Sequence, residues 1–225
     1  MYANYYEKHG ADRNDLLANP EVVFQTFAFD RANIAALRRI PADRSSARVL
    51  DVGCGTGSSL LQFERLGFDP RNLSGVDNSS ERIDRARALL PASDFRCENA
   101  ESLSYADETF DIVFESTMLG TLDSRQLLER ISREMVRVAK RGGHLVLTDW
   151  RYSRKGSGVE TAMSRGMIKS LFSIGEATDL ISTERGALVP PLGRFLSKRL
   201  PSLYFLVQGL VPAAVGQIST VLRRR

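Results

Sequence analysis

Three closely spaced glycines are the feature of this sequence with the clearest chemical meaning. Gly53, Gly55 and Gly57 follow a β-type segment at residues 48–52 and precede residues 58–66, which have the pattern of a helix. Glycine has no Cβ atom, so a ligand can approach the backbone closely, and the start of the next helix offers free N–H groups to an anion. This order of elements predicts a ligand-binding turn between a strand and a helix.

An acidic residue stands at the distance that ribose recognition requires. Asp77 ends the next β-type segment, residues 73–76, and lies 20 residues after Gly57. A carboxylate at the end of this second strand can accept hydrogen bonds from both hydroxyls of a ribose. The glycine turn and Asp77 together predict a cofactor that contains a nucleoside.

The elements that must position these residues alternate between strand and helix periods. We expect strands at residues 48–52, 73–76, 94–97, 110–114 and 145–148, and helices at 20–40, 58–66, after a cap at Ser79 or Ser80, and at 128–138 up to Gly142-Gly143. The first of these helices places Val23, Phe27, Ile34 and Leu37 on one stripe. The alternation predicts an α/β fold, a parallel sheet with helices on both faces, whose ligands bind beyond the carboxyl ends of the strands.

The position of the third glycine separates two classes of cofactor. A dinucleotide turn, G-x-G-x-x-G/A, would have Gly or Ala where this chain has Ser58. With Val-Leu-Asp-Val-Gly-Cys-Gly-Thr-Gly, Gly-Val-Asp at 75–77, Glu-Asn-Ala-Glu at 98–101, Phe-Asp-Ile-Val-Phe at 110–114 and Arg-Gly-Gly-His-Leu at 141–145, the chain resembles the class I methyltransferases. The resemblance covers residues 48–150 and is closest to the small-molecule branch that includes quinone-biosynthesis C-methyltransferases. It implies a Rossmann-like, seven-stranded, mostly parallel sheet whose last strand is antiparallel, and S-adenosyl-L-methionine as cofactor.

The resemblance also implies roles for residues of the glycine turn. Gly53, Gly55 and Gly57, with Cys54 between them, would border the methionine and ribose portions of the cofactor. Asp51 would support the turn or reach the amino group. Cys54 has packing as its first interpretation and reactivity as its second.

Further roles fall on the next strand ends. Asp77 would hold the ribose hydroxyls and Asn78 would lie beside the adenine. Asn99 stands where the family often has Asp, and its amide oxygen could accept a bond from the adenine amino group. Ala100 could offer its backbone N–H to the cofactor, and Glu101 completes this cofactor-binding segment. Glu115, at the end of the fourth strand, would lie near the methionine end.

A general base is needed only for some acceptors. The cofactor brings its own leaving group, so a base matters when the acceptor is a hydroxyl, a protonated amine or an acidic carbon. The candidates are His9, in an N-terminal arm with Tyr2, Tyr5 and Tyr6, together with Asp149 and Glu115 at strand ends. A solvated position for His9 and core packing for the tyrosines are the alternatives. His144 is expected to be structural, and no cluster has metal-ligand spacing.

The length of 225 residues predicts a single domain, and its charge is unevenly distributed. We divide the chain into an arm and helix at 1–46, a cofactor-binding core at 47–150 and substrate-side elements at 151–225. The last part carries twelve basic and four acidic side chains, net +8, and the first 150 residues carry −4. This asymmetry suits a solvated basic face, an anionic partner or a membrane surface. The absence of a disulfide framework and of a signal-like N-terminal run predicts a cytoplasmic protein.

The last third contains an unusual uncharged run, residues 200–222. Helices are expected at 159–172 and after Pro190-Pro191, and strands at 178–184 and 217–222. The run is long enough to span a bilayer, but Pro201, Pro212 and several Gly and Gln residues interrupt it. Two interpretations remain: a core helix plus strand, or a hydrophobic face with a basic rim that contacts a membrane peripherally or a lipid-linked substrate.

We interpret the chain as an S-adenosylmethionine-dependent enzyme acting on a small-molecule or lipid-linked acceptor. Residues 188–194, Leu-Val-Pro-Pro-Leu-Gly-Arg, and the segment after them loosely resemble methyltransferases encoded with bacterial polysaccharide-assembly enzymes, which implies O-methylation of a sugar hydroxyl. C-methylation of a quinone-like ring and a catalytically silent cofactor-binding regulator are the alternatives. A nucleic-acid substrate is not expected, because the fourth strand is followed by Glu-Ser-Thr-Met rather than an Asn-Pro-Pro-Tyr type motif. A homodimer is compatible with the sequence.

Overall fold

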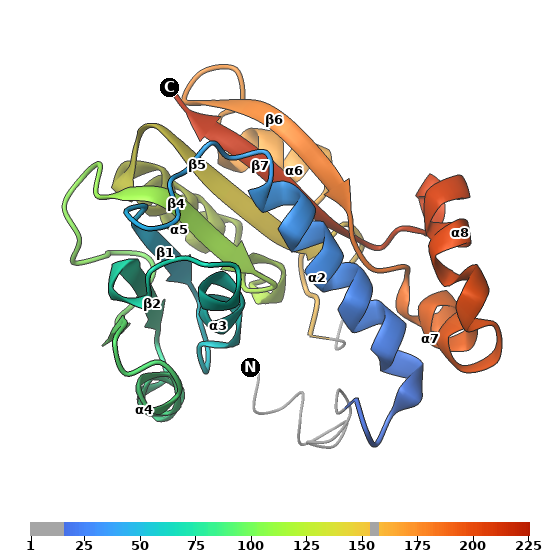
Figure 1. The fold of residues 1–225 in the computed structure, drawn as a ribbon. Helices are drawn as coiled ribbons and strands as arrows, with labels where there is room; N and C mark the ends of the chain where they lie inside the picture. The colour runs from blue at the N-terminus through green and yellow to red at the C-terminus, as the bar shows by residue number, and fades with distance from the viewer. Residues whose placement is uncertain (1–15, 154–157) are drawn as a thin grey trace.

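The computed structural model describes residues 16–153 and 158–225 and contains one seven-stranded sheet (Figure 1). The strands are β1 (Val49–Val52), β2 (Leu73–Asp77), β3 (Asp94–Cys97), β4 (Phe110–Ser116), β5 (Ala139–Trp150), β6 (Thr178–Arg185) and β7 (Gln217–Arg224), in the order β3-β2-β1-β4-β5-β7-β6. The first five pair in parallel, whereas β7 is antiparallel to both β5 and β6. The predicted Rossmann-like sheet with an antiparallel last strand is confirmed.

Helices cover both faces of this sheet (Figure 1). α2 (Val23–Leu37), α3 (Ser58–Arg65) and α4 (Ser80–Leu89) pack on one face, where Phe63 meets Phe114 edge-on at a centroid distance of 5.3 Å. α5 (Arg125–Val138) and α6 (Arg165–Leu171) pack on the other, where Met135 joins a core with Leu50 and Val113. Successive strand residues point to opposite faces, so each strand contributes to both cores.

The packed face of α2 differs from the expected apolar stripe. The buried residues are Ala28, Ala32, Ala36 and Asn33, whereas Phe27 and Ile34 remain 51% and 37% exposed. Alanine lets the helix backbone approach the sheet closely. Asn33 is fixed there because its amide oxygen accepts a hydrogen bond from the buried Thr148 hydroxyl at 2.8 Å.

Two element boundaries also correct the sequence interpretation. β5 begins directly after α5 and includes the glycine pair that was expected to end the helix. A Cβ atom on Gly143 would lie 2.9 Å from the Lys140 carbonyl oxygen, so the backbones meet too closely there for a side chain. His144 therefore lies within β5, where burial and then the charge of Arg223 lower its pKa. The helix expected over 159–172 is only α6, which begins after a Ser164 cap.

A long excursion, residues 186–216, connects β6 to β7. It contains α7 (Pro190–Arg199), the 3₁₀ turn η5 (Pro201–Leu203), α8 (Tyr204–Leu210) and the 3₁₀ turn η6 (Pro212–Ala214), and it projects from the side of the sheet in Figure 1. β6 is parallel to β5, because both are antiparallel to β7, so the excursion leaves from the carboxyl edge of the parallel strands. Within the described ranges, no helix has the length and apolarity to cross a bilayer.

Candidate functional site

The glycine turn is held against β2 by its own backbone. The N–H groups of Gly53 and Cys54 donate to the Val76 carbonyl oxygen at 2.8 and 3.0 Å. Gly53, Gly55 and Gly57 have φ values of 77°, 53° and 86°, a left-handed region that favours glycine. A Cβ on Gly53 would lie 2.5 Å from the Met118 side chain. One on Gly55 would meet no atom of residues 16–153 or 158–225 within 4 Å, apart from its neighbours in the chain. The turn is thus closed on one side and open at Gly55, where a ligand can approach.

Asp77 connects this turn to β2 and α4. One carboxylate oxygen accepts from the Gly55 N–H and the other from the Ser79 N–H, both at 3.0 Å. Ser79 itself caps α4, because its hydroxyl accepts from the Arg82 N–H at 3.4 Å. Each carboxylate oxygen retains a further lone pair. Asp77 can therefore order the turn and still accept hydrogen bonds from two ribose hydroxyls.

The segment after β3 is where we expect the adenine to bind. The amide oxygen of Asn99 accepts from the Glu101 N–H at 3.0 Å, and its amide nitrogen donates to the Glu101 carboxylate at 3.1 Å. Glu101 also binds Arg130, and this bond, followed by that from Asn99, lowers the pKa of Glu101. Asn78 is exposed and Ala100 is partly buried against the core. Glu101 thus supports Asn99, whose oxygen keeps one lone pair for a ligand.

Three carboxylates lie buried at the carboxyl ends of neighbouring strands. Asp51, Glu115 and Asp149 are 1%, 0% and 2% exposed. Among the residues that the structure describes, neither oxygen of Asp51 has a hydrogen-bond partner, nor does Oε1 of Glu115. Asp149, in contrast, accepts from the Gly120 and Trp150 N–H groups at 2.6 Å. Burial, and then the charge of Asp77, raises the pKa of Asp51 to about 8. Burial raises the pKa of Asp149 to about 7 and, with the charge of Asp149, that of Glu115 well above its ordinary value.

Unpartnered buried carboxylates are costly unless a ligand completes their bonding. S-adenosyl-L-methionine carries a sulfonium and an ammonium group, so it brings positive charge and N–H donors. The open turn at Gly55, the free lone pairs of Asp77 and the unpartnered oxygens of Asp51 and Glu115 all fit this cofactor. Asp51 would hold the amino group and Asp77 the ribose.

The turn after β4 is a part of the site that sequence reasoning missed. Thr117 has a φ of 58°, although β-branched residues rarely adopt the left-handed region. Its N–H donates to the Thr148 carbonyl oxygen at 2.9 Å, and the next residue, Met118, closes the glycine turn. Strained backbone of this kind gathers at functional sites. Nothing in the residue types signals it, since Thr gives no expectation of positive φ.

Cys54 and His9 differ from the other candidate residues, because Cys54 packs in the core and His9 lies outside the described residues. Cys54 is 6% exposed, and its sulfur would lie 2.8 Å from a Cβ atom on Gly75. Burial raises the pKa of its thiol, so Cys54 packs as a neutral side chain. His9, together with Tyr2, Tyr5 and Tyr6, lies outside the described residues, and its role as a base stays a prediction.

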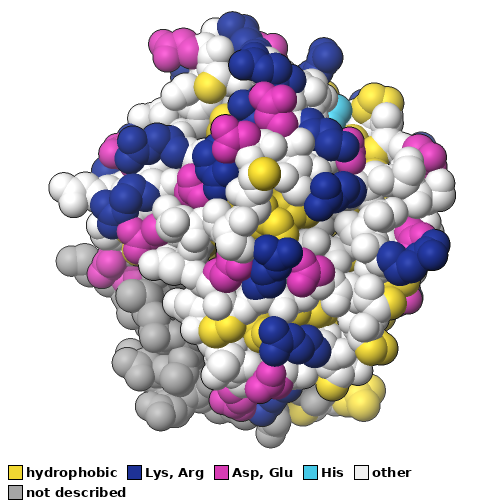
Figure 2. Space-filling view, turned by 90° about the vertical axis from the view of Figure 1, so that its left-hand side faces the viewer, with side chains coloured by type: hydrophobic (Ala, Val, Ile, Leu, Met, Phe, Trp, Pro, Cys, Tyr) yellow, Lys and Arg dark blue, Asp and Glu magenta, His cyan; other side chains and the backbone are white. Residues whose placement is uncertain are grey.

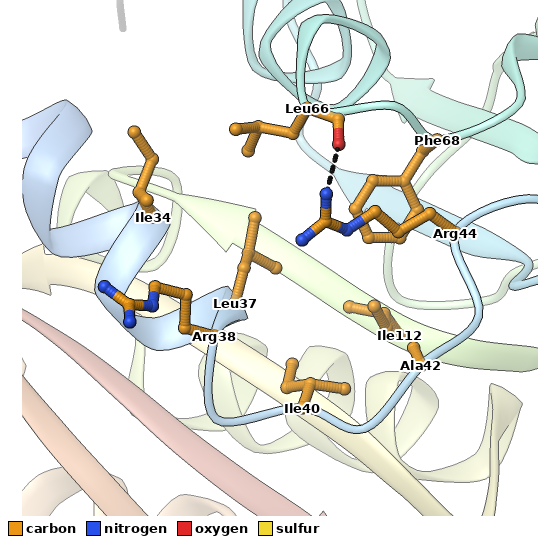
Figure 3. Close-up of a pocket in the computed structure, with 9 residues that line it drawn as sticks. All are labelled: Ile34, Leu37, Arg38, Ile40, Ala42, Arg44, Leu66, Phe68 and Ile112. Carbon is orange, nitrogen blue, oxygen red and sulfur yellow. Dashed lines mark hydrogen bonds between the residues drawn. The ribbon is translucent and has the colours of Figure 1, made fainter.

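A hollow of about 190 Å³ lies elsewhere on the molecule (Figure 3). Apolar side chains surround it, including Leu37 at the end of α2, Ile40 in the segment after α2 and Phe68 in the segment after α3. Ile112, near the start of β4, also lines it. Arg44 crosses one side and donates to the Leu66 carbonyl oxygen at 3.0 Å. These residues belong to the amino edge of the strands, so the hollow is separate from the glycine turn.

The amino-acid sequence of the chain is similar to those of known methyltransferases. Residues 50–147 match the family model described as a methyltransferase domain. The chain is 33% identical over 150 residues to phosphatidylethanolamine N-methyltransferase of Cereibacter sphaeroides, covering 62% of this chain and 70% of that protein. It is 35% identical over 106 residues to 2-methyl-6-phytyl-1,4-hydroquinone methyltransferase of Synechocystis, covering 45% of this chain but only 31% of the relative.

The fold is also shared with solved structures. An S-adenosylmethionine-dependent methyltransferase from Mesorhizobium loti superimposes with a TM-score of 0.62 at 18% identity, covering 86% of this chain and 98% of that one. A protein from Pyrococcus horikoshii gives a TM-score of 0.65 at 16% identity, covering 95% and 98%. At these identities the likeness shows the fold alone.

Asp77→Ala is expected to weaken binding of S-adenosylhomocysteine by about 1–3 kcal/mol, a loss of roughly 5- to 150-fold in affinity. The loss follows because two ribose hydroxyls would have no acceptor. Isothermal titration measures it, with exposed Asp84→Ala on α4 as the control. Unchanged affinity in a folded Asp77 variant would remove Asp77 from the ribose site.

Asp51→Asn should change how stability depends on pH. The pKa of Asp51 is raised in the folded state from 3.8 to about 8. Folding therefore favours the protonated acid, and this contribution is complete below about pH 4 and lost as the pH rises to 8. Urea unfolding should show that the free energy of unfolding of the variant, relative to that of the wild type, increases between pH 4 and pH 8 by on the order of a few kcal/mol.

Asp123→Asn, at an exposed position, is the control for this effect. Parallel pH profiles for the Asp51 variant and the wild type would contradict the assignment of a buried, unpartnered carboxylate. Saturating S-adenosylmethionine should reduce the difference, because its ammonium group stabilises the ionised form of Asp51.

Proposed function

The chain belongs to the class I S-adenosylmethionine-dependent methyltransferases of the small-molecule branch, and on that premise we propose that its acceptor carries a long apolar chain. The observation that carries this proposal is the excursion between β6 and β7. It leaves from the same edge of the sheet as the glycine turn and exposes Leu206 and Leu210 by 54% and 72%. Exposed leucines at the sheet edge that carries the glycine turn suit an amphiphilic acceptor.

The names of the relatives agree with an acceptor of this class. Those relatives act on phosphatidylethanolamine, on a phytyl hydroquinone and, in Bacteroides fragilis, on demethylmenaquinone. The Bacteroides enzyme is 28% identical over 178 residues, covering 76% of this chain and 63% of the relative. These acceptors differ in the atom methylated but all carry apolar chains.

The acceptor group that we propose is a hydroxyl, on a sugar linked to a lipid. Bound S-adenosylmethionine supplies an activated methyl group together with its leaving group. The chain then has to orient the acceptor, exclude water and remove one proton. Asp149 is our candidate base because its pKa of about 7 suits proton transfer near neutrality. Both its oxygens already accept backbone N–H bonds, so it also anchors the turn at Gly120.

Methylation of a ring carbon in a hydroquinone is the second candidate, and the quinone-pathway relatives favour it. A phenolic ring also requires loss of a proton, so Asp149 would serve both reactions. A regulator that binds the cofactor without turnover differs from both, since it would bind S-adenosylhomocysteine and methylate nothing.

Acceptor class is tested with labelled S-adenosylmethionine and matched acceptor pairs in detergent. The pairs are a polyprenyl-linked sugar and its chain-free sugar phosphate, a prenylated hydroquinone and its chain-free ring, and phosphatidylethanolamine and phosphoethanolamine. We expect methylation of one long-chain member and at least about tenfold lower kcat/KM for its chain-free partner. Equal rates within the methylated pair would contradict the proposal. Turnover of no member, with cofactor binding intact, would favour the regulator.

Asp149→Asn is expected to lower kcat/KM by roughly 10²- to 10⁴-fold while leaving affinity for S-adenosylhomocysteine unchanged. In the wild type, kcat/KM should rise with pH to a plateau above about 7, because the ionised carboxylate is the base. Rate measurements across this pH range test both statements. A variant with the wild-type rate and profile would leave Asp149 only its role at the Gly120 turn.

A further inference from the structure

α8 buries side chains with polar groups and exposes leucines, the reverse of an ordinary surface helix. Its buried side chains, Tyr204 and Gln208, both carry polar groups. The Tyr204 hydroxyl accepts from the Leu188 N–H at 3.1 Å, and the Gln208 amide donates to the Gly186 carbonyl oxygen at 2.5 Å and accepts from Arg31. Polar contacts therefore fix the inner face of the helix, and its leucines are left outside.

The outward residues form what we call the C-terminal apolar patch: Leu200, Leu203, Leu206, Leu210 and Val211. Their side chains are 45%, 38%, 54%, 72% and 45% exposed. Leu203, Leu206 and Leu210 follow helical spacing, so they line one side of η5 and α8. Large apolar residues gathered in this way mark an interaction surface rather than scattered exposure.

The charged side chains that directly precede the patch, Lys198 and Arg199, are both cationic. Lys198 and Arg199 are exposed at the end of α7 directly before Leu200, and within the described residues neither has an ion-pair partner. The sequence has no acidic residue after Glu184. The opposite side of the molecule differs, because Figure 2 shows cationic and anionic side chains interspersed there. On α4, for example, Arg85 and Glu81 form an ion pair at 2.8 Å.

Apolar side chains bordered by unpaired cations match the interface of an anionic bilayer, where leucines enter the acyl region and Lys or Arg bind lipid phosphates. We propose that the C-terminal apolar patch, with Lys198 and Arg199, docks the enzyme on the surface of an anionic phospholipid membrane. The patch lies on the carboxyl edge of the sheet, the edge that holds the glycine turn. Docking would bring the edge of the sheet that holds the glycine turn to the membrane. The proposal rests on the C-terminal apolar patch and its two cations, and it does not depend on whether the acceptor is a lipid.

Sedimentation with vesicles tests this docking without cofactor or acceptor, so its result is separate from that of the acceptor assay. The full chain is mixed with vesicles of phosphatidylcholine alone or with a quarter phosphatidylglycerol, at low and at high salt. We expect binding to the anionic vesicles that weakens with salt. Leu206→Glu/Leu210→Glu should weaken it by at least about tenfold. Lys198→Glu/Arg199→Glu should abolish the preference for anionic lipid.

Leu89→Glu is the matched control, because Leu89 is 42% exposed on α4, away from the patch. It should bind like the wild type, and thermal unfolding should show that all variants are folded. Wild-type protein that does not sediment with anionic vesicles would overturn the proposal, as would a leucine variant that binds normally. Light scattering tests whether a second copy of the chain covers the patch instead. A wild-type dimer that dissociates in the Leu206→Glu/Leu210→Glu variant would assign the patch to that second copy and overturn membrane docking.

Discussion

The hydrogen bond between the Asp77 carboxylate and the Gly55 N–H is the interaction on which the site depends. It fixes a turn of left-handed glycines at the switch point, where β1 lies between β2 and β4. The same carboxylate accepts from the Ser79 N–H and so sets the start of α4. One side chain therefore aligns two strands, a turn and a helix, and a carboxylate is needed because only it can accept these bonds and those of a ribose together.

Burial of Asp51, Glu115 and Asp149 in one region gives the site its electrostatic character. Their raised pKa values mean that the protein alone holds part of this charge as neutral acid. A cation restores ionisation, so affinity for the cofactor and the protonation of the site are coupled. The same region stores backbone strain at Thr117, which the surrounding strands maintain.

The strand order of the sheet sets the position of the C-terminal excursion, residues 186–216. Because β7 returns antiparallel between β5 and β6, the chain must leave and re-enter at the carboxyl edge. Residues between Gly186 and Gly216 are thereby placed at the same edge of the sheet as the glycine turn. The fixed position of Gln208, which is bound to Gly186 and Arg31, decides that α8 presents leucines outward. Core and excursion thus place cofactor chemistry and an apolar surface on one edge.

Residue types and spacing alone predicted the strand and helix alternation, the glycine turn and the cofactor, and they assign the ribose to Asp77, because these inferences depend on local spacing and on backbone freedom. The sequence did not determine which side of α2 is buried: Ala32 and Asn33 face the sheet and Phe27 does not, which depends on how closely the helix can approach. It also did not show that Gly143 lies inside β5, that Thr117 is strained, or that Asp51 has no hydrogen-bond partner in the described part of the chain. These features arise from contacts between segments far apart in the chain, and only the tertiary structure brings those segments together.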